Sequence, residues 1–342
     1  MRLEENDMQD SSTGGYENPP GRQSWIQHSW KSMEQSCVYP FSILCFILFI
    51  MLIPPSHGGT KSLGYEALSN GAHVPLLGLA TLSFAWILVA CVRKATPFYV
   101  ASLLSFFFAV AIEIIQPVFG RDFSLGDIGL DLIGIFGAWV LYRMLSTGMN
   151  LVSLANGLVC LGLVVWFAVL PVVSGYGIDG YMSEQFPLLS GFKVDGEENY
   201  WRSVEGDSSD VVSMDFVKHE GTGAEGTLYL SAQGKYAGAE YRPVVSDWSG
   251  YSWIKLSVEN KGLPALVGIR IDDSGDSTDY GQRFNKAIEL PSGESTIAIS
   301  LEEVSRAVED REFNISEIYR FLIFSLEETV KVELYIHSFK LT

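Results

Sequence analysis

The sequence predicts a multi-domain chain in which an α-helical membrane bundle of five spans precedes an all-β jelly-roll sandwich. Residues 37–172 contain five apolar runs of near-spanning length and only five Lys/Arg and five Asp/Glu. After about residue 180, short alternating runs of apolar and polar residues replace the continuous apolar ones. The whole chain is only 18% charged and its mean hydropathy is +0.20, whereas about a quarter of the residues of an average soluble chain are charged.

The first 36 residues are polar, contain Asn-Pro-Pro-Gly at 18–21 and show no apolar period, so we expect a disordered tail. The uncharged run 37–53 follows and ends at Pro54-Pro55. A secretory signal would begin closer to the N-terminus and carry a basic stretch and a small-residue cleavage site. We therefore interpret this run as the first spanning helix.

Four further apolar runs, each close to the roughly 20 residues needed to cross a bilayer, complete the predicted bundle: 74–92, 97–119, 128–145 and 151–172. Basic residues in short loops mark the cytoplasmic side. One side holds Arg22, Lys31, Arg93, Lys94 and Arg143, and the other holds Lys61 and Arg121. The tail is therefore expected in the cytoplasm, and five spans place the C-terminal half outside a plasma (inner) membrane.

The C-terminal half reads as a linker over 173–184 and a sandwich over 185–342. Ile254, Leu256 and Val258 alternate with polar residues, and similar strand-like runs recur. These runs are 211–217, 226–233, 267–271, 282–290, 295–301, 318–326 and 330–341. Turn-forming residues separate them at 259–262, 272–275 and 291–293, and many short strands at this spacing are typical of a β-sandwich or jelly roll.

Charge and cysteine content exclude several classes of function. Residues 173–342 carry fifteen Lys/Arg and twenty-nine Asp/Glu, a net −14 of the total −17, and so acidic a domain is a poor nucleic-acid binder. All four cysteines precede it, which excludes a disulfide framework or a Cys-based zinc site there. No nucleotide-binding loop, serine-hydrolase elbow or zinc-protease motif occurs, and we predict no cofactor and no metal. The sequence does not predict the oligomeric state.

Six polar residues converge between spans two and four, at their outer ends. Each is expected on the same side of the membrane: His73, Glu113, Gln116, Arg121, Asp127 and Asp131. Glu113 and Gln116 share one helix face, as do Asp127 and Asp131, because three or four residues complete about one turn. Small residues at 134 and 138 continue the second face and allow a neighbouring helix to approach closely.

Two interpretations of this cluster remain open. Ionisable residues inside a membrane are costly and suggest a ligand-binding or catalytic site. The structural alternative is that Glu113 forms a clamp with Arg121 while Asp127 caps span four. His73 is a further candidate partner for Glu113.

This pattern of a His, then Glu-x-x-Gln, an Arg, and Asp-x-x-x-Asp followed by Gly134 resembles the VanZ-like membrane family, named after a teicoplanin-resistance protein. The resemblance covers residues 37–145. Asp131 stands where the family usually has Asn, and Ser69-Asn70-Gly71-Ala72 replaces a common Asp-Lys pair. The resemblance implies an envelope protein, linked in some members to glycopeptide resistance, without a settled biochemical activity.

The C-terminal half is similar to galactose-binding-like jelly rolls, several of which are carbohydrate-binding modules. The similarity is carried by Trp248-Ser-Gly-Tyr-Ser-Trp253, Ile269-Arg270-Ile271-Asp272 and Tyr280-Gly-Gln-Arg283-Phe284. Arg270, Asp272, Tyr280 and Arg283 are the candidate glycan-binding residues, because planar polar and aromatic side chains hold sugars. Trp253 and Phe284 equally suit a core or a bare strand surface, and such sandwiches also bind proteins.

Together these observations favour a non-enzymatic membrane protein of the cell envelope. Its bundle would bind a polar headgroup or cell-wall ligand at the outer leaflet, and its tethered sandwich would bind glycan. The alternative is a membrane-embedded enzyme that acts on lipid-linked or cell-wall precursors, with Glu113, Asp127 and His73 as acid–base groups. A third alternative is a scaffold for envelope assembly.

Overall fold

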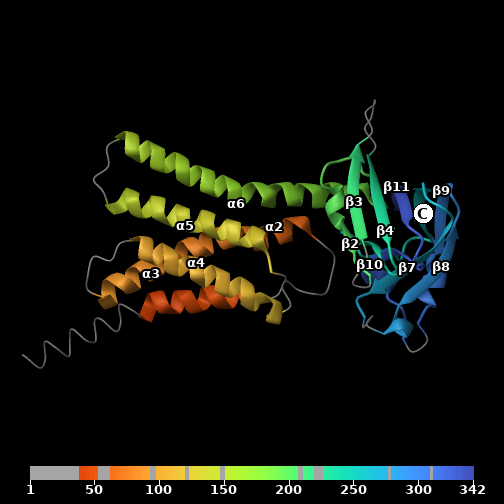
Figure 1. Ribbon diagram of the computed structural model, residues 1–342, viewed down its shortest axis with the longest axis horizontal. Helices are drawn as coiled ribbons and strands as arrows, with labels where there is room; N and C mark the ends of the chain where they lie inside the picture. Colours follow the sequence, from red (N-terminus) through yellow and green to blue (C-terminus); the bar gives the residue numbers. More distant parts are fainter. Residues whose placement is uncertain are drawn as a thin grey trace, which may run out of the picture.

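The computed structural model describes residues 38–52, 62–92, 98–119, 123–146, 151–206, 211–218, 226–275, 279–308 and 311–342. The molecule is elongated, with a helical bundle at one end and a β-sandwich at the other (Figure 1). The helix Val38–Leu52 starts at the end of the bundle that is far from the sandwich, and α6 runs from that far end into the sandwich (Figure 1).

Four helical segments are long and apolar enough to cross a membrane: Leu63–Ala90, Phe98–Phe119, Leu125–Ser146 and Leu151–Gln185. The first of them comprises α2 (Leu63–Gly71) and α3 (His73–Val92). The second comprises α4 (Phe98–Ile115) and a 3-10 turn, η1 (Gln116–Phe119), and the others are α5 (Leu125–Ser146) and α6 (Leu151–Gln185).

The expected first span forms a shorter apolar helix, Val38–Leu52. At 1.5 Å per residue it is about 22 Å long, less than the roughly 30 Å of a bilayer's hydrocarbon core. Four candidate spans are therefore established by length and composition, and a fifth is not confirmed. The expected tail, residues 1–36, lies outside the described residues.

The segment 173–184 is helical, and the expectation of a linker there is wrong. The helix α6 continues without interruption to Gln185. Packing against α2 explains this continuity, because a Cβ at Gly175 would lie only 2.7 Å from the backbone nitrogen of Gly64. A helix of 35 residues is about 52 Å long, so α6 extends well beyond a bilayer core toward the sandwich.

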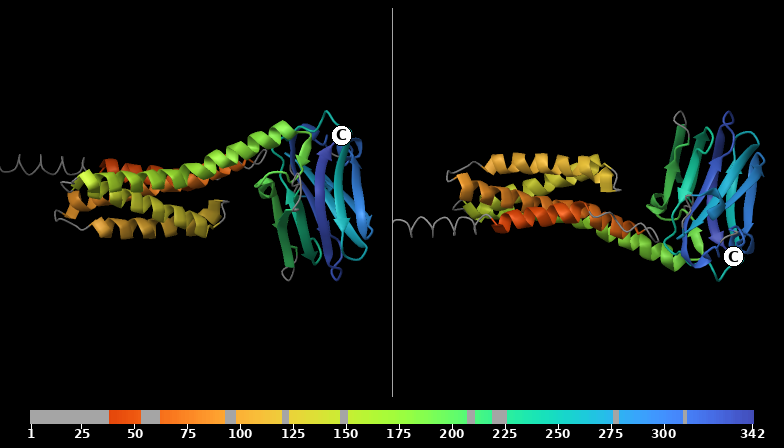
Figure 2. Two further views of the ribbon diagram at one scale, coloured as in Figure 1. Left: turned by 90° about the horizontal axis from the view of Figure 1, so that it is seen from above. Right: turned by 90° about the horizontal axis from the view of Figure 1, so that it is seen from below.

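The sandwich consists of two antiparallel sheets in the described part of the chain (Figure 2). One has the order β3-β4-β11-β6-β9, with β1 also paired to β11. Its strands are Val211–Lys218, Gly226–Gln233, Val332–Leu341, Trp253–Asn260 and Gly293–Ser300, and β1 is Leu188–Ser190. The other has the order β2-β5-β10-β7-β8. Its strands are Trp201–Val204, Gly238–Tyr241, Ile318–Ser325, Ala265–Asp273 and Phe284–Leu290.

The core lies between the two sheets, as strand alternation predicts. Ile254, Leu256 and Val258 of β6 are fully buried in it. Met182, from the last turns of α6, belongs to the same core, and Leu63 of α2 packs against it. The sandwich core therefore incorporates residues that precede the expected domain start at 185.

A buried carboxylate, Asp179 of α6, forms hydrogen bonds to both the bundle and the sandwich. It accepts hydrogen bonds from the backbone N–H groups of Leu63 and Gly64, both at 2.9 Å, at the N-terminus of α2. It also accepts hydrogen bonds from the hydroxyls of Ser62 and Tyr200. Burial, reinforced by this carboxylate, raises the pKa of Tyr200 well above its ordinary value and keeps the phenol a donor.

Candidate functional site

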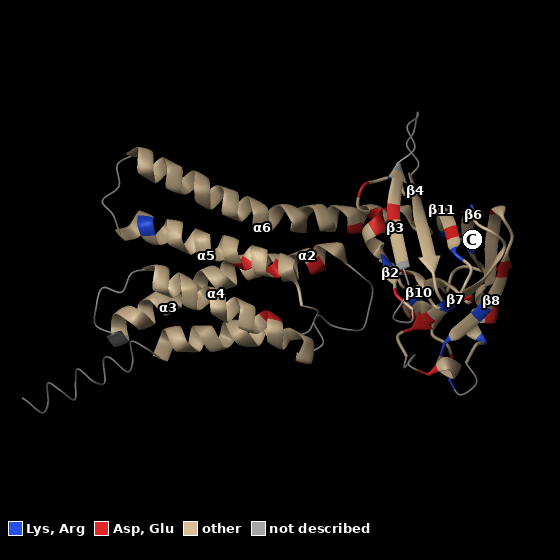
Figure 3. Ribbon diagram, viewed as in Figure 1, with Lys and Arg blue, Asp and Glu red and all other residues tan. Residues whose placement is uncertain are grey.

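Three helix ends bring polar side chains together at the end of the bundle that faces the sandwich (Figure 3). His73 is the first residue of α3, Glu113 lies in the last turn of α4, and Asp127 and Asp131 lie in the first turns of α5. The helices α3 and α5 approach closely because residue 134 is glycine, and a Cβ there would lie 2.2 Å from the Val74 carbonyl oxygen. This crossing sets His73 beside Asp131.

The four ionisable residues form one buried cluster. His73 Nδ1 lies 2.9 Å from Asp131 Oδ1, and His73 Nε2 lies 3.9 Å from Asp127 Oδ2. One ligand atom each of His73, Glu113 and Asp131 lies within 4.8 Å of the others. None of the four residues is more than 6% exposed, so the expected convergence of these residues is observed.

The partner of Glu113 in the described residues is a backbone group. Its Oε2 accepts a hydrogen bond of 3.0 Å from the Ser124 N–H, just before α5. The Ser124 hydroxyl in turn accepts from the Asp127 N–H at 3.2 Å and so caps α5. Ser124 therefore takes the capping role that the structural alternative gave to Asp127. Arg121, the expected cationic partner, lies outside the described residues.

Gln116 lies beside this cluster and joins it to the first helix. Its side-chain nitrogen donates a hydrogen bond of 3.3 Å to the Met51 carbonyl oxygen, where the helix Val38–Leu52 is ending. The residue is fully buried, and its other amide atom, Oε1, has no hydrogen-bond partner in the described part of the chain. Gln116 thus fixes the first helix against η1.

The four sandwich residues expected to bind glycan lie near one another on the five-stranded sheet. Arg270 and Asp272 point away from the core, since Ile269 and Ile271, which alternate with them along β7, are buried in it. Asp272 pairs in register with Arg320 of β10. Tyr280 and Arg283 lie just before β8, whose Phe284 pairs with Ile271. This outward side is named here the arginine face.

Sequence reasoning missed two strands' contributions to the arginine face. The carboxylate of Asp272 is bound by Arg270, with the closest Nη2–Oδ2 distance 2.7 Å, and by Arg320. Arg320 also reaches Glu240 of β5 at 3.3 Å, and Glu240 binds Arg242. The alternation of Glu240 and Arg242 around a core tyrosine was the available signal, but β5 has only four residues.

The arginines remain accessible while the acids beneath them do not. The side chains of Arg270, Arg320 and Arg242 are 16%, 23% and 30% exposed, whereas Asp272 is 0% exposed. Burial by itself lowers the pKa of Arg320, but the adjacent Asp272 carboxylate outweighs it and raises that pKa above its ordinary value. The face therefore presents fixed positive charge on a domain that is acidic overall.

The rim of the arginine face is aromatic. Tyr280 is 69% exposed, and the Arg283 guanidinium lies 5.5 Å from the centre of its ring. Burial, together with the neighbouring Arg270, lowers the pKa of Arg283. Both residues line a hollow of about 600 Å³ that continues toward α7 (Leu301–Ser305) and includes Glu302 and Arg306.

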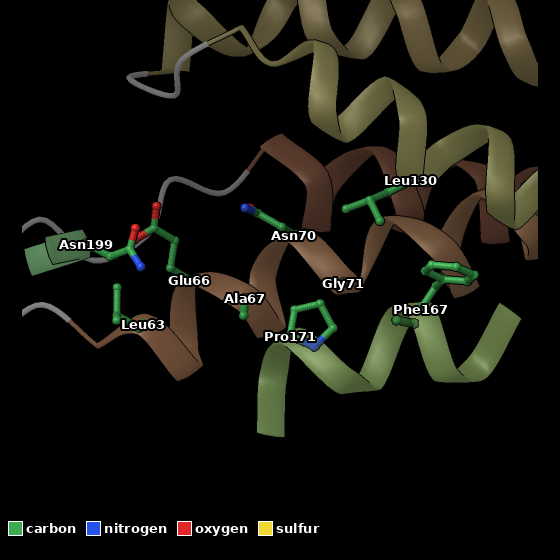
Figure 4. A pocket seen from close by; sticks show the side chains of 10 residues that line it. Leu63, Glu66, Ala67, Asn70, Gly71, Leu130, Phe167, Pro171 and Asn199 are labelled. Atoms are coloured by element: carbon green, nitrogen blue, oxygen red, sulfur yellow. The ribbon is translucent and has the colours of Figure 1, made fainter. Parts of the chain in front are cut away.

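A second cavity, of about 340 Å³, lies at the junction of the two halves (Figure 4). It is lined by α2, α5 and α6 together with one residue of the sandwich, Asn199. Glu66 and Asn70 of α2 are polar groups on its wall, while Phe167 and Pro171 form its apolar side (Figure 4).

Comparison with known proteins gives matches for the sandwich alone. No protein-family model matches the chain, and no curated protein matches it. The VanZ-like resemblance of residues 37–145 therefore stays a prediction.

Solved carbohydrate-binding modules resemble the C-terminal part of the chain. The family 11 module from Clostridium thermocellum, in complex with a β-1,3-1,4-mixed-linked tetrasaccharide, is 19% identical, with 45% of this chain and 93% of that chain covered and a TM-score of 0.37. The family 30 module of a cellulosomal cellulase from Clostridium thermocellum is 15% identical, with coverages of 42% and 91% and a TM-score of 0.31. An exo-β-agarase is 16% identical, with coverages of 45% and 25% and a TM-score of 0.34. At these identities the similarity concerns the sandwich fold alone.

Proposed function

We propose that this chain is a membrane-anchored binding protein of the cell envelope, whose sandwich binds glycan through the arginine face. The observation that carries the proposal is the accessible row of Arg242, Arg320 and Arg270 above buried carboxylates, with Tyr280 exposed at its rim. Guanidinium groups donate several hydrogen bonds in a fixed plane, and paired acids hold them in place. The excess of arginine over acid favours a glycan with carboxylate or phosphate groups.

The proposed membrane topology has five spans, a cytoplasmic tail and an external sandwich. Basic residues in the short loops support this orientation. The helix Val38–Leu52 and α6 both run toward the sandwich (Figure 1), which is consistent with a tail on the opposite side. In a thinner or locally adjusted bilayer, a short first helix can still span.

We further propose that the bundle belongs with VanZ-like proteins and binds a polar headgroup or cell-wall component at the outer leaflet, with a role in glycopeptide resistance or polysaccharide handling. The convergence of His73, Glu113, Asp127 and Asp131 in one buried cluster supports a site there. The continuous α6 and the Asp179 junction hold the two sites in one molecule. A second contact made by the same molecule has a raised effective concentration.

Binding of glycan is tested with the full-length protein in mild detergent, on an array of neutral and acidic polysaccharides that includes cell-wall fragments. Arg270→Ala and Tyr280→Ala are each expected to lower apparent affinity about tenfold or more, equivalent to about 1.4 kcal/mol. Arg270→Ala leaves Asp272 its contact with Arg320, so the fold should persist. Lys331→Ala, which removes a cation just before β11 of the other sheet, is the matched control. An array without any ligand would refute glycan binding.

An enzymatic function is the second candidate, and the pairing of His73 with Asp131 favours it. This pair orients the imidazole so that Nε2 faces Asp127 at 3.9 Å, as an acid–base group requires. Glu113→Gln distinguishes the candidates. An enzyme would lose turnover of lipid-linked precursors with its fold intact, whereas a binding protein would keep its affinity within a modest factor.

A further inference from the structure

We infer that His73, Glu113 and Asp131 hold one divalent transition-metal ion, with Asp127 beside it, at the end of the bundle that faces the sandwich. This site goes beyond the proposed glycan binding and does not depend on it. The three side chains come from α3, α4 and α5, so the ion would join three helices at one point.

The distances are close to those of a metal site. One ligand atom from each of the three side chains lies within 4.8 Å of the other two. Nitrogen and oxygen ligands lie about 2.0–2.2 Å from Zn²⁺ in a tetrahedral site, so two ligand atoms of one ion are separated by about 3.3–3.6 Å. A contraction of at most about 1.5 Å would therefore complete the coordination. Asp127 already approaches His73 Nε2 to 3.9 Å and supplies a fourth ligand.

In each of the three proposed ligands, one polar atom of the side chain is hydrogen-bonded and another has no hydrogen-bond partner among the described residues. His73 is held through Nδ1 and Asp131 through Oδ1, while His73 Nε2 and Asp131 Oδ2 have no hydrogen-bond partner in the described structure. Glu113 is held through Oε2 by the Ser124 N–H, and its Oε1 has none among the described residues. Metal ligands are commonly oriented in this way, by a hydrogen bond to the atom that does not bind the metal.

The atoms without hydrogen-bond partners belong to buried side chains, and this burial supports a bound cation. His73 is 1% exposed, and Glu113 and Asp131 are 0% exposed. Buried polar atoms without a partner are rare, and buried carboxylates need a cation, a proton or a metal to offset their desolvation. No lysine or arginine in the described ranges forms an ion pair with Glu113, Asp127 or Asp131. A divalent cation would both complete the bonding and compensate the charge.

The set of ligands favours a particular class of metal. Carboxylates alone suit Mg²⁺ and Ca²⁺, whereas imidazole suits Zn²⁺, Fe²⁺ and related ions. One imidazole with two or three carboxylates therefore points to Zn²⁺ or Mn²⁺. No cysteine sulfur contributes, since the described free cysteines, Cys45 and Cys160, are not members of the cluster.

The test measures metal binding by the full-length protein, purified in detergent, treated with chelator and titrated with Zn²⁺ or Mn²⁺ alone. We expect close to one equivalent of retained metal by mass spectrometry and a higher melting temperature with metal. Substitution with Co²⁺ should give a visible absorption band. His73→Gln and Glu113→Gln are each expected to weaken the affinity at least tenfold. The matched controls are His337→Gln in the sandwich and Glu66→Gln on α2, which should leave the affinity unchanged.

Asp131→Asn keeps the proposal falsifiable if the other variants do not fold, because asparagine retains an oxygen acceptor for His73 Nδ1. It should fold and bind metal more weakly than the unmodified protein. The inference is overturned if the unmodified protein retains less than about a tenth of an equivalent at saturating metal. It is equally overturned if all three cluster variants bind as tightly as the two controls.

Discussion

The end of the bundle and the sandwich both bury carboxylates, but the bonding of these carboxylates differs between the two regions. In the sandwich, Asp272 and Glu240 are bound by arginines, and Glu197 accepts four backbone hydrogen bonds of 2.7–3.0 Å. In the bundle, Glu113 and Asp131 each keep an oxygen without a hydrogen-bond partner among the described residues. The sandwich is acidic overall yet compensated locally, whereas the bundle has few charges and leaves its buried ones incompletely bonded.

This difference distinguishes carboxylates that support the fold from carboxylates that can bind a ligand. A carboxylate whose bonding is complete cannot accept another ligand without losing a partner, so Glu197 and Asp272 act as scaffold. A carboxylate with a buried, unbonded oxygen gains free energy when a ligand or proton supplies the missing contact. A ligand bound at the bundle cluster should therefore change the stability of the protein most. Substitutions in the arginine face should change the affinity for a ligand more than the stability of the fold.

The largest effect should follow removal of the Glu197 carboxylate. Glu197→Ala leaves the N–H groups of residues 191–194 without their acceptor, and two of these residues, Gly191 and Phe192, are buried. Bonds to a charged group contribute about 1.5–3 kcal/mol each, so a loss of at least about 3 kcal/mol in unfolding free energy is expected. Chemical denaturation followed by tryptophan fluorescence measures it. Glu198→Ala, which loses one such bond, is the control and should cost only about 1.5 kcal/mol.

The second effect concerns the junction between the halves. Asp179→Ala removes the acceptor for Leu63 and Gly64 at the start of α2 and leaves Tyr200 unpaired. We expect a loss of about 2 kcal/mol and faster hydrogen exchange at the first amides of α2, while amides in the centre of the sandwich stay protected. Glu184→Ala, an exposed acid on the same helix, should change neither. Unchanged exchange at α2 would show that Asp179 does not couple the halves.

Whether the sequence predicted a feature of these two regions depends on the length of the element and on whether its contacts are local in the chain. Long strands such as β4, β10 and β11 followed from alternation, but β1, β2 and β5 have three or four residues, too few to show a period. Convergence of His73, Glu113 and Asp131 was predictable, because helix periodicity and a short loop fix it. The Ser124 backbone as the partner of Glu113 was not, since backbone donors leave no mark in residue type.

The same reasoning explains the error at 173–184. Glycine and polar residues there suggested a linker, whereas Gly175 permits the close contact with α2, and the polar Asp179 forms bonds at the junction. Tertiary contact thus overrides local helix propensity. The ion pairs of Arg320 were hidden for a similar reason, because their partners Glu240 and Asp272 lie far away in the chain.

A smaller effect is the acid sensitivity of the sandwich. Burial opposes ionisation of Asp273, yet hydrogen bonds from Arg311 and from the Asn314 N–H hold its pKa below the ordinary value. Because the pKa is lower in the folded state, this stabilisation is present above the unfolded value of about 3.9 and is lost as pH falls through the folded value. The melting temperature should therefore decline below about pH 4. Asp273→Asn should flatten part of that decline, and an unchanged slope would contradict the assignment.

The smallest effect on the fold is expected for Asp131→Asn. This variant distinguishes most sharply between the incompletely bonded carboxylates of the bundle and the arginine-bound carboxylates of the sandwich. Asparagine occupies nearly the same volume and keeps an oxygen for the hydrogen bond from His73 Nδ1, 2.9 Å long in the structure. It also removes one negative charge from a cluster that holds Glu113 and Asp127 close by, which relieves repulsion. The stability of the metal-free protein should therefore change by less than about 1 kcal/mol. In Asp272→Asn, by contrast, two arginines lose a charged partner, so the same substitution should cost about 2 kcal/mol or more. Thermal unfolding of the two variants in chelator measures the contrast. Equal losses of stability would show that Asp131 contributes as much to the fold as Asp272 does.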